Sequence, residues 1–537
     1  MKKRRFIRLF RHRVNIILLL LLQIAFIAFL LITSNRIMYA LNTVMTILGA
    51  IISLRIISND EKSGYKITWI FIILIFPLFG VSFYLIFTSQ INRKKIFKKY
   101  DYIKRKADKY NEMINKENKS KKIDCFNYGN AIYLKNHAKF PLFLNQASKY
   151  LSPGELFFEE LKLELQKAEK YIFMEYFIIQ EGKMWNEILE ILKQKVSEGV
   201  KIRIIYDDIG CFLKLPINYK KYLNKLGIEC EVFNKFRPIL TTQQNNRDHR
   251  KITVIDGKVA FTGGINLADE YINEKNLYGH WKDSAIKIVG DAAWEYALIF
   301  LQIWEMITNC DEDYLLYRPE QEKIKTSDGF IQPYADNPKD HENVGENVYL
   351  NMVNSAKKTL YITTPYLIID NTLLSSIKLA SKNGVDVKII TPGKYDKKLV
   401  SLVTKSYYSE LIKAGVKIYE YQKGFIHSKI FISDKDIATI GTTNLDFRSL
   451  YLHFECGTCL YKSEEIKTIK KDFDKTLADC REIEIKDCKK GKFKAFLISI
   501  LRLFAPLMWL LDKKELRKFL FLLIENYCCS YIILWNY

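Results

Sequence analysis

The 537-residue sequence lacks the paired cysteine spacing of a disulfide-rich secreted protein. Its ten cysteines are scattered, and Cys456 and Cys459 form a C-x2-C pair with no second pair to complete a zinc site. A metal or redox role for this pair is therefore disfavoured. Cys528 and Cys529 lie in an apolar tail, where burial explains them better than acylation does. We expect a reducing compartment.

Acidic residues are missing where basic residues are densest. Residues 2–13 hold seven Lys or Arg and no acid, and residues 93–109 hold nine against Asp101 and Asp108. Each block therefore carries seven of the net +23 charges. Because both blocks flank apolar segments, their charge indicates attraction to anionic lipid headgroups, and nucleic acid is not expected as a partner.

Long runs without charge are confined to the ends of the chain. Residues 14–33 carry no formal charge and are long enough to cross a hydrocarbon core of about 30 Å. Residues 67–87 are predicted as a second span, despite Pro77 and Gly80, because transmembrane helices tolerate both residue types. Residues 37–54 form a weaker apolar segment between them.

The two basic blocks also predict the topology. The positive-inside rule puts both blocks in the cytoplasm, which requires an even number of crossings. We therefore predict two spans, with one apolar segment interfacial or re-entrant, and a cytosolic location for everything after about residue 90. Residues 1–95 form the membrane region and residues 96–130 a basic linker, so the predicted location is the cell membrane, in a multi-pass arrangement.

The rest of the chain contains one order of elements twice. An apolar β-run is followed by a helix, a second β-run, a helix and a third β-run. The β-runs are 171–179, 198–208 and 226–234 in the first copy, and 360–369, 383–393 and 414–422 in the second. This alternation predicts an α/β fold of two tandem units, 131–315 and 316–489, with mixed, largely parallel sheets covered by helices.

Each copy ends in a His-x-Lys-x4-Asp motif that enters a strand. On a strand the His and Lys, two residues apart, face the same side. An uncharged imidazole can attack phosphorus, and a neighbouring lysine can hold the anionic oxygens as charge builds, so the pair suits a phosphodiester. The motif residues are His249, Lys251 and Asp256 in the first copy and His427, Lys429 and Asp434 in the second.

An asparagine follows each motif at the same offset. Asn266 and Asn444 each lie seventeen residues after the motif histidine, behind a glycine turn, and their amides can donate to phosphoryl oxygens. A single His-x-Lys is usually an ordinary surface strand pair. The repetition of His, Lys, Asp, Gly and Asn at equal offsets disfavours that interpretation.

The roles of the remaining acids and histidines are predicted from their positions relative to the motifs. Asp256 and Asp434 lie at the far end of the motif, so turn closure and support of the fold suit them as well as direct chemistry does. We assign the orientation of each imidazole to another acid, Glu455 or its counterpart Asp283. The remaining histidines are expected in solvent or packing roles, and they are residues 12, 137, 280, 341 and 453.

With these motifs the sequence resembles the phospholipase D superfamily, and more narrowly the bacterial cardiolipin synthases. The similarity extends over the amino-terminal spans and over runs such as NNRDHRKITVIDGKVAFTGGINLADEY (245–271), GHWKDS (279–284) and KIYEYQKGFIHSK (417–429). It implies two tandem phospholipase-D-like α/β/α sandwiches that form one active site at a pseudo-twofold interface, with one histidine from each copy.

The resemblance also implies a reaction. One histidine attacks the phosphorus of phosphatidylglycerol and expels glycerol, and a hydroxyl of a second phosphatidylglycerol then takes the phosphatidyl group. His249 is the nucleophile and His427 the general acid and then base, although the symmetry allows the reverse. No metal or other cofactor is expected, since two lysines neutralise the charge, and nothing in the sequence predicts an oligomeric state. The residues that hold the phosphoryl oxygens are Lys251, Lys429, Asn266 and Asn444.

Three other functions are compatible with parts of the sequence. A hydrolase would use the same motifs with water as the acceptor, and a membrane-tethered nuclease shares them too, although the location of the charge argues against it. A non-catalytic lipid-binding protein is disfavoured because both motifs are complete. The tail, residues 490–537, extends beyond the run 501–508, near which these synthases commonly end. It suits an interfacial helix as well as a packed helix or hairpin.

Overall fold

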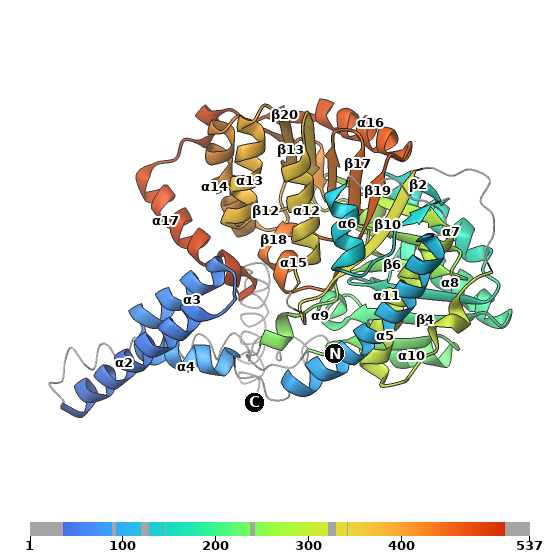
Figure 1. The fold of residues 1–537 in the computed structure, drawn as a ribbon, viewed down its shortest axis with the longest axis horizontal. Coiled ribbons are helices and arrows are strands. Elements are labelled where there is room, and N and C mark those ends of the chain that lie inside the picture. The colour runs from blue at the N-terminus through green and yellow to red at the C-terminus, as the bar shows by residue number, and fades with distance from the viewer. Residues whose placement is uncertain are drawn as a thin grey trace, which may run out of the picture.

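The computed structural model describes residues 36–88, 93–119, 128–144, 146–236, 242–320, 329–340 and 342–510. Within these ranges the chain forms two α/β units and a projecting group of amino-terminal helices (Figure 1). The apolar run 14–33 and the end of the tail, residues 511–537, lie outside the described residues.

The first unit is built on a seven-stranded sheet in the order β2-β9-β7-β6-β3-β4-β5. Strands β3, β4 and β5 are parallel because helices connect them, whereas the other neighbouring pairs are antiparallel. The strands are β2 (Ala147–Leu151), β3 (Tyr171–Tyr176), β4 (Lys201–Asp207), β5 (Glu229–Phe233), β6 (Lys251–Ile255), β7 (Val259–Gly263) and β9 (Ala285–Val289).

The second unit repeats this sheet in the order β1-β10-β19-β17-β16-β11-β13-β14-β20. Its seven inner strands match the first sheet one by one, and β1 and β20 are added at the edges. The strands are β1 (Phe143–Leu144), β10 (Phe330–Asp336), β11 (Thr359–Thr363), β13 (Asp386–Pro392), β14 (Lys417–Tyr421), β16 (Ile430–Ser433), β17 (Ile437–Gly441), β19 (Glu455–Tyr461) and β20 (Cys480–Glu482). The predicted pair of tandem α/β units is confirmed.

The prediction of largely parallel sheets is wrong. Helical crossovers make β3-β4-β5 and β11-β13-β14 parallel, as the alternation indicated. Each motif strand, however, turns back on itself through a tight hairpin, so β6 and β7 are antiparallel, and so are β16 and β17. Most neighbouring strands are consequently antiparallel.

Helices cover the sheets in three layers. The outer face of the first sheet packs against α7 and α8, and that of the second sheet packs against α12, α13 and α14 (Figure 1). The inner faces of both sheets share one hydrophobic core, to which α5, α11 and α16 contribute. The helices are α5 (Arg93–Lys119), α7 (Gly154–Gln166), α8 (Lys183–Ser197), α11 (Asp291–Thr308), α12 (Val344–Ser355), α13 (Asn371–Lys382), α14 (Lys398–Lys413) and α16 (Glu465–Ala478).

Helix α11 makes the two units one body. Every residue from Ala292 to Leu301 is buried, which an apolar helix achieves only when it is surrounded by protein. Its Tyr296 hydroxyl donates to the Gly457 carbonyl of the second unit at 2.9 Å, while the helix also packs on strands of the first. The resemblance implied two tandem sandwiches that meet at an interface, and in the structure the inner faces of the two sheets share one hydrophobic core.

Two predicted boundaries are corrected. The predicted basic linker, 96–130, is mostly the helix α5, which docks on α11 through an ion pair of 2.6 Å between Lys106 and Glu305. Residues 131–144 were expected to open the first unit. Their helix α6 (Gly129–Asn136) and strand β1 belong instead to the second, because β1 pairs with β10.

The amino-terminal helices are α2 (Arg36–Ser58), α3 (Ser63–Ile75) and α4 (Pro77–Thr88). Among the described helices, only the stretch Tyr39–Ser58 is long and apolar enough to cross a membrane. This stretch includes most of residues 37–54, which the sequence predicts as the weaker apolar segment. The predicted continuous span 67–87 is wrong, because it is divided between α3 and α4.

The break in this span has a local cause. Phe76 precedes Pro77, which disfavours helical geometry at Phe76 and suits the first position of a new helix. A Cβ on Gly80 would lie 2.6 Å from the Cα of Ile73, so glycine lets α4 fold back along α3. Trp69 then packs against rings of α4 that include Phe83, at 5.4 Å. The two helices form a hairpin.

The hairpin docks on the second unit beside the carboxyl-terminal tail. The Tyr65 ring contacts Phe447 edge-on at 5.8 Å, and the Thr68 hydroxyl donates to the Leu503 carbonyl at 2.7 Å. Leu503 ends the tail helix α17 (Lys492–Leu503), whose Phe493 and Phe496 are exposed. The membrane region, the second unit and the tail therefore meet at one place.

The motif aspartates close the two hairpins. Asp256 and Asp434 both have φ +52°, and they lie at the opposite end of the motif strand from the histidine, roughly 20 Å away. The Asp256 carboxylate accepts hydrogen bonds of 2.7–2.8 Å from three consecutive backbone amides, and Asp434 accepts three of 2.7–2.9 Å. Their assignment as catalytic residues is corrected, because these contacts tie each hairpin to the neighbouring strand.

Replacing Asp256 by alanine removes the acceptor of three backbone amides. We expect the free energy of unfolding to fall by about 2 kcal/mol or more, because hydrogen bonds to a charged acceptor are strong. Asp256→Asn keeps one acceptor oxygen and should cost less. Thermal unfolding of the detergent-solubilised protein measures both changes. A variant as stable as the wild type but inactive would show instead that the carboxylate acts in the chemistry.

Candidate active site

Backbone pairing between the units positions the two motif histidines. The His249 amide donates to the Phe454 carbonyl at 2.9 Å, next to an isolated bridge between the units. On the other side the His427 amide donates to the Lys282 carbonyl at 2.7 Å, where β15 (Gly424–Ile426) runs parallel to β8 (His280–Lys282). Each histidine therefore enters the site alongside a strand of the other unit.

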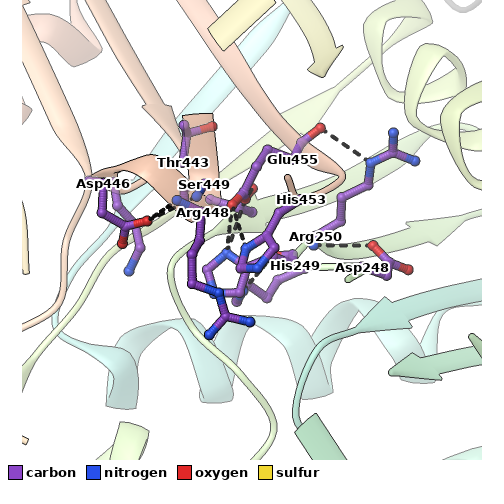
Figure 2. A network of polar contacts seen from close by, with 12 residues as sticks. Asp248, His249, Arg250, Thr443, Asp446, Arg448, Ser449, His453 and Glu455 are labelled. Carbon is purple, nitrogen blue, oxygen red and sulfur yellow. Dashed lines mark hydrogen bonds and ion pairs between the residues drawn. The ribbon is translucent and has the colours of Figure 1, made fainter. Parts of the chain in front are cut away.

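The acids that face these histidines are exchanged between the units. His249 Nδ1 lies 2.9 and 3.0 Å from the two carboxylate oxygens of Glu455, and His427 Nδ1 lies 2.6 Å from Asp283 Oδ2. Figure 2 shows the first of these pairs. Both acids are fully buried, and each histidine is 7% exposed. The structure thus brings together both motif histidines and both acids named from the sequence.

The two acids differ in their electrostatics. Burial raises the pKa of Glu455 well above its usual value. Burial also opposes ionisation of Asp283, but the protonated form of His427 and the charge of Lys429 outweigh it and hold the pKa of Asp283 below its usual value. Asp283 is therefore the acid better able to stabilise a positive charge on its histidine.

Both imidazoles are held uncharged near neutral pH. Burial, together with Lys251, lowers the pKa of His249 well below its usual value. Burial and Lys429 lower the pKa of His427 to about 4. When Nδ1 donates to the acid, Nε2 keeps its lone pair and can attack an electrophile or accept a proton.

The motif lysines lie beside the histidines. Lys429 Nζ is 2.9 Å from His427 Nδ1, and Lys251 Nζ donates to the His249 carbonyl at 2.5 Å. Burial lowers the pKa of Lys251 to about 8 and that of Lys429 to about 7. An anion bound between them would raise these values, so the site is suited to a phosphate.

The two asparagines are in different states. Asn266 accepts from the Ile178 amide at 3.0 Å and donates to the Tyr271 hydroxyl at 2.7 Å, so its side chain is used within the protein. Tyr271 in turn lies with its ring 5.6 Å from that of His427. Asn444 is buried, and its Oδ1 has no hydrogen-bond partner among the described residues.

Sequence reasoning missed the side chains that support the acids. Arg250 lies between His249 and Lys251 in the motif, and its Nε donates to the Glu455 carbonyl at 3.2 Å. Thr442 donates from its hydroxyl to the Glu455 carboxylate. The matching position in the first unit is Gly264, where a Cβ would lie 2.1 Å from Asp283 Oδ1. The difference between Gly264 and Thr442 at matching positions of the repeats could have indicated that the two acids have different surroundings.

His453 was expected in a packing role but lies in the site. Its ring is 5.4 Å from that of His249, and the Trp281 ring is 5.3 Å from that of His427. Each of these flanking rings comes two residues before the acid, an offset that the sequence repeats and that could have identified them.

A metal could be held at one end of the site. Among the described residues, the one group suited to a cation is His249, His453 and Glu455, whose ligand atoms lie within 4.8 Å of one another. The neighbouring Lys251 repels a cation, and the sequence expectation that no metal is needed stays a prediction. Cys456 and Cys459 are buried as free thiols on β19, outside this group.

Comparisons with known proteins identify the family. A model described as the PLD-like domain of cardiolipin synthase matches residues 161–304 and 349–477, and a phospholipase D-nuclease amino-terminal model matches residues 44–87. An uncharacterised protein of Streptococcus mutans is 44% identical over 460 residues, covering 85% of this chain and 99% of that protein.

Named relatives are similar over almost as much of the chain. Cardiolipin synthase 2 of Bacillus anthracis is 35% identical, covering 86% of this chain and 90% of that protein. A cardiolipin synthase of Halalkalibacterium halodurans is 34% identical, covering 87% and 94%. The crystal structure of phosphatidylserine synthase from Haemophilus influenzae has the same fold at 14% identity, with a TM-score of 0.54, covering 70% of this chain and 98% of that one. The chain therefore belongs to the bacterial cardiolipin synthases of the phospholipase D superfamily.

Proposed function

We propose that this phosphatidyltransferase joins two molecules of phosphatidylglycerol into cardiolipin and releases glycerol, through a phosphatidyl-histidine. The observation that carries the proposal is the exchange of acids, which orients two uncharged imidazoles toward one interface beside two lysines. A double displacement at phosphorus needs this set of groups: a nucleophile, a proton donor and acceptor, and cations for the phosphoryl oxygens.

In the first step one histidine attacks the phosphorus of the donor lipid. The P–N bond forms and the bond to the glycerol oxygen breaks. The other histidine, which takes up a proton on Nε2 when the anionic lipid binds beside it and raises its pKa, gives that proton to the leaving oxygen. In the second step the acceptor hydroxyl gives its proton to the second histidine while its oxygen attacks phosphorus. The P–N bond then breaks and restores the first imidazole.

We assign His249 as the nucleophile and His427 as the acid and then base. Asp283 has a lowered pKa and so supports a proton on His427, whereas the raised pKa of Glu455 gives a charged His249 less support. Glu455 and Asp283 act as positioning residues, because each meets the Nδ1 atom that faces away from the reacting nitrogen.

Four side chains contribute to phosphate binding in this proposal. Lys251 and Lys429 hold the charged oxygens, and Asn444 donates from its amide. Asn266 acts through the Tyr271 hydroxyl that it contacts at 2.7 Å. Asp256 and Asp434 have no part in this step.

A hydrolase would let water resolve the same intermediate. Three aromatic rings surround His427, the residue that would activate the acceptor: Trp281, Tyr271 and Phe425 lie at 5.3, 5.6 and 5.8 Å between ring centroids. An apolar surround of this kind disfavours bulk water and suits a hydroxyl delivered on a lipid. These contacts favour transfer over hydrolysis.

We propose a multi-pass arrangement in the bacterial cell membrane, with the catalytic units in the cytoplasm. Residues 14–33 and helix α2 would supply the two crossings. Helices α3 and α4 are each about 20 Å long or less, too short for a core of about 30 Å, so their hairpin would enter and leave on the cytoplasmic side. The exposed apolar side chains of α17 fit an interfacial helix, since the carboxyl-terminal end of this helix contacts the hairpin.

The reaction is tested on purified protein in phosphatidylglycerol vesicles, with lipids and glycerol followed by mass spectrometry. We expect cardiolipin and glycerol from the wild type. His249→Ala should lower the rate by about a thousandfold or more and form no covalent intermediate, because the nucleophile is gone. His427→Ala loses the acid of the first step and the base of the second. We expect phosphatidyl-enzyme to form more slowly and then to accumulate, because resolution by the acceptor hydroxyl needs the base.

The exposed His137 provides a control, and His137→Asn should match the wild type. Phosphatidic acid without cardiolipin would contradict the transferase. Accumulation of the covalent intermediate in His249→Ala rather than in His427→Ala would reverse the two assigned roles.

The lysines predict how donor binding depends on pH. With pKa values of about 7 for Lys429 and about 8 for Lys251, both side chains are charged below these values and lose their protons as the pH rises. The KM for phosphatidylglycerol should therefore increase between about pH 6.5 and 8.5. Initial rates at several lipid fractions measure it. Lys429→Arg keeps its charge and should weaken the dependence, whereas a KM that is flat over this range would refute the explanation.

The topology is tested by labelling thiols in intact cells with a membrane-impermeant maleimide. Ser34→Cys, between residues 14–33 and α2, should react from outside. Asp60→Cys, between α2 and α3, and the exposed native Cys310 should react only after permeabilisation. Labelling of Asp60→Cys in intact cells would rule out the proposed arrangement.

A further inference from the structure

Arg448 is a cation beside the active site, and no ion pair holds its side chain among the described residues. It lies on the short helix α15 (Phe447–Tyr451), and its Nε is buried without a hydrogen bond among the described residues. The nearby Asp446 carboxylate caps the helix instead, accepting from the amides of Arg448 and Ser449 at 2.8 and 2.9 Å. An unpaired guanidinium costs free energy to bury, so an anionic ligand would stabilise it.

His453 is a second polar group at the same place. It is 7% exposed, and neither ring nitrogen makes a hydrogen bond among the described residues, although Nδ1 lies 3.6 Å from the Glu455 carboxylate. Its amide donates to the Arg448 carbonyl at 2.9 Å, and its ring is 5.4 Å from that of His249. In Figure 2 the Arg448 side chain lies beside the rings of His453 and His249. Two side chains with unused hydrogen-bonding nitrogens, Arg448 and His453, therefore border His249.

The matching positions in the first unit have the opposite character. Four residues after the asparagine, the second unit has Arg448 and the first has Glu270, which pairs with Lys214 at 2.9 Å. Two residues before the acid, the second unit has His453 and the first has Trp281. At these two positions, therefore, only the second unit has side chains that could bind an anion.

The second unit is also the one that faces the membrane helices. The Tyr65 hydroxyl of α3 donates to the Phe447 carbonyl at 3.5 Å, next to Arg448 in the chain. Lys62 pairs with Glu346 at 2.5 Å, and the Tyr451 hydroxyl donates to the same carboxylate at 2.7 Å. Arg448 therefore lies between the catalytic histidine and the hairpin along which a lipid would approach.

Cardiolipin formation brings two phosphodiesters into one site. The motif lysines serve the phosphate that reacts. The acceptor lipid carries a second phosphate, separated from its attacking hydroxyl only by the glycerol headgroup, so that phosphate comes close to the reacting centre. It needs its own cation, and arginine is the side chain best suited to grip a phosphate through paired N–H donors.

We propose that Arg448, assisted by His453, binds the phosphodiester of the acceptor lipid. This subsite rests on the proposed transfer between two phosphatidylglycerols. It distinguishes an acceptor that carries a phosphate from water or a simple alcohol, because only the former gains the contact with Arg448.

The test compares two acceptors in one reaction. Wild-type enzyme and Arg448→Gln are given phosphatidylglycerol vesicles with ethanol in the buffer, and cardiolipin and phosphatidylethanol are quantified together by mass spectrometry. Both products use the same donor and intermediate, so their ratio reports the acceptor alone and does not depend on how much enzyme folds. We expect Arg448→Gln to lower the cardiolipin to phosphatidylethanol ratio about tenfold or more, and Arg448→Lys to lower it less.

His453→Gln should lower the same ratio by a smaller factor. If Arg448→Gln forms neither product, the ratio in His453→Gln tests the acceptor subsite instead. Arg481→Gln, at an exposed position of β20, is the matched control and should leave the ratio unchanged. An equal loss of both products in the Arg448 and His453 variants would overturn the acceptor subsite while leaving the transferase intact. A wild type that forms no cardiolipin would overturn the proposed function, and the subsite with it.

Discussion

The exchange of acids between the two units is the interaction on which the rest of the structure depends. Each motif imidazole contacts a carboxylate of the other unit: His249 contacts Glu455, and His427 contacts Asp283. Both carboxylates are fully buried, and a buried acid that loses its partner costs several kcal/mol, roughly 3–5. The core that the two units share around α11 holds the two sheets together and therefore holds each histidine next to its acid. Packing of the core and the geometry of the site thus depend on the same residues.

The repeated offsets in the sequence made much of this structure predictable. The equal spacing of His, Lys and Asn identified two copies of one unit, and the position of Glu455 after Asn444 identified an acid that lies beside a histidine. The sequence did not show which acid contacts which histidine, because partners such as His249 and Glu455 are 206 residues apart in the chain. Only docking of the two sheets brings them together.

Elsewhere, single residues overrode the broader pattern. Hydropathy joined residues 67–87 into one helix, but Phe76 before Pro77 ends the helix and Gly80 admits the return segment. The motif aspartates follow His and Lys at a spacing that the chain repeats, which suggested a catalytic role. Their positive φ and three amide partners show that the spacing belongs to the hairpin, which the motif needs in order to present its histidine.

One feature of the second sheet affects how the protein is made. Strand β1 pairs with β10, and Phe143 lies opposite Ile331, so the second sheet includes a segment synthesised long before its partner strand. The helices α2, α3 and α4 leave the ribosome earlier still. At the usual rate of about 5–20 residues per second, the segment 128–144 waits roughly 10–40 seconds for β10. The second sheet therefore cannot be completed until β10 is made, whereas the strands of the first sheet, residues 147–289, are all synthesised before β10.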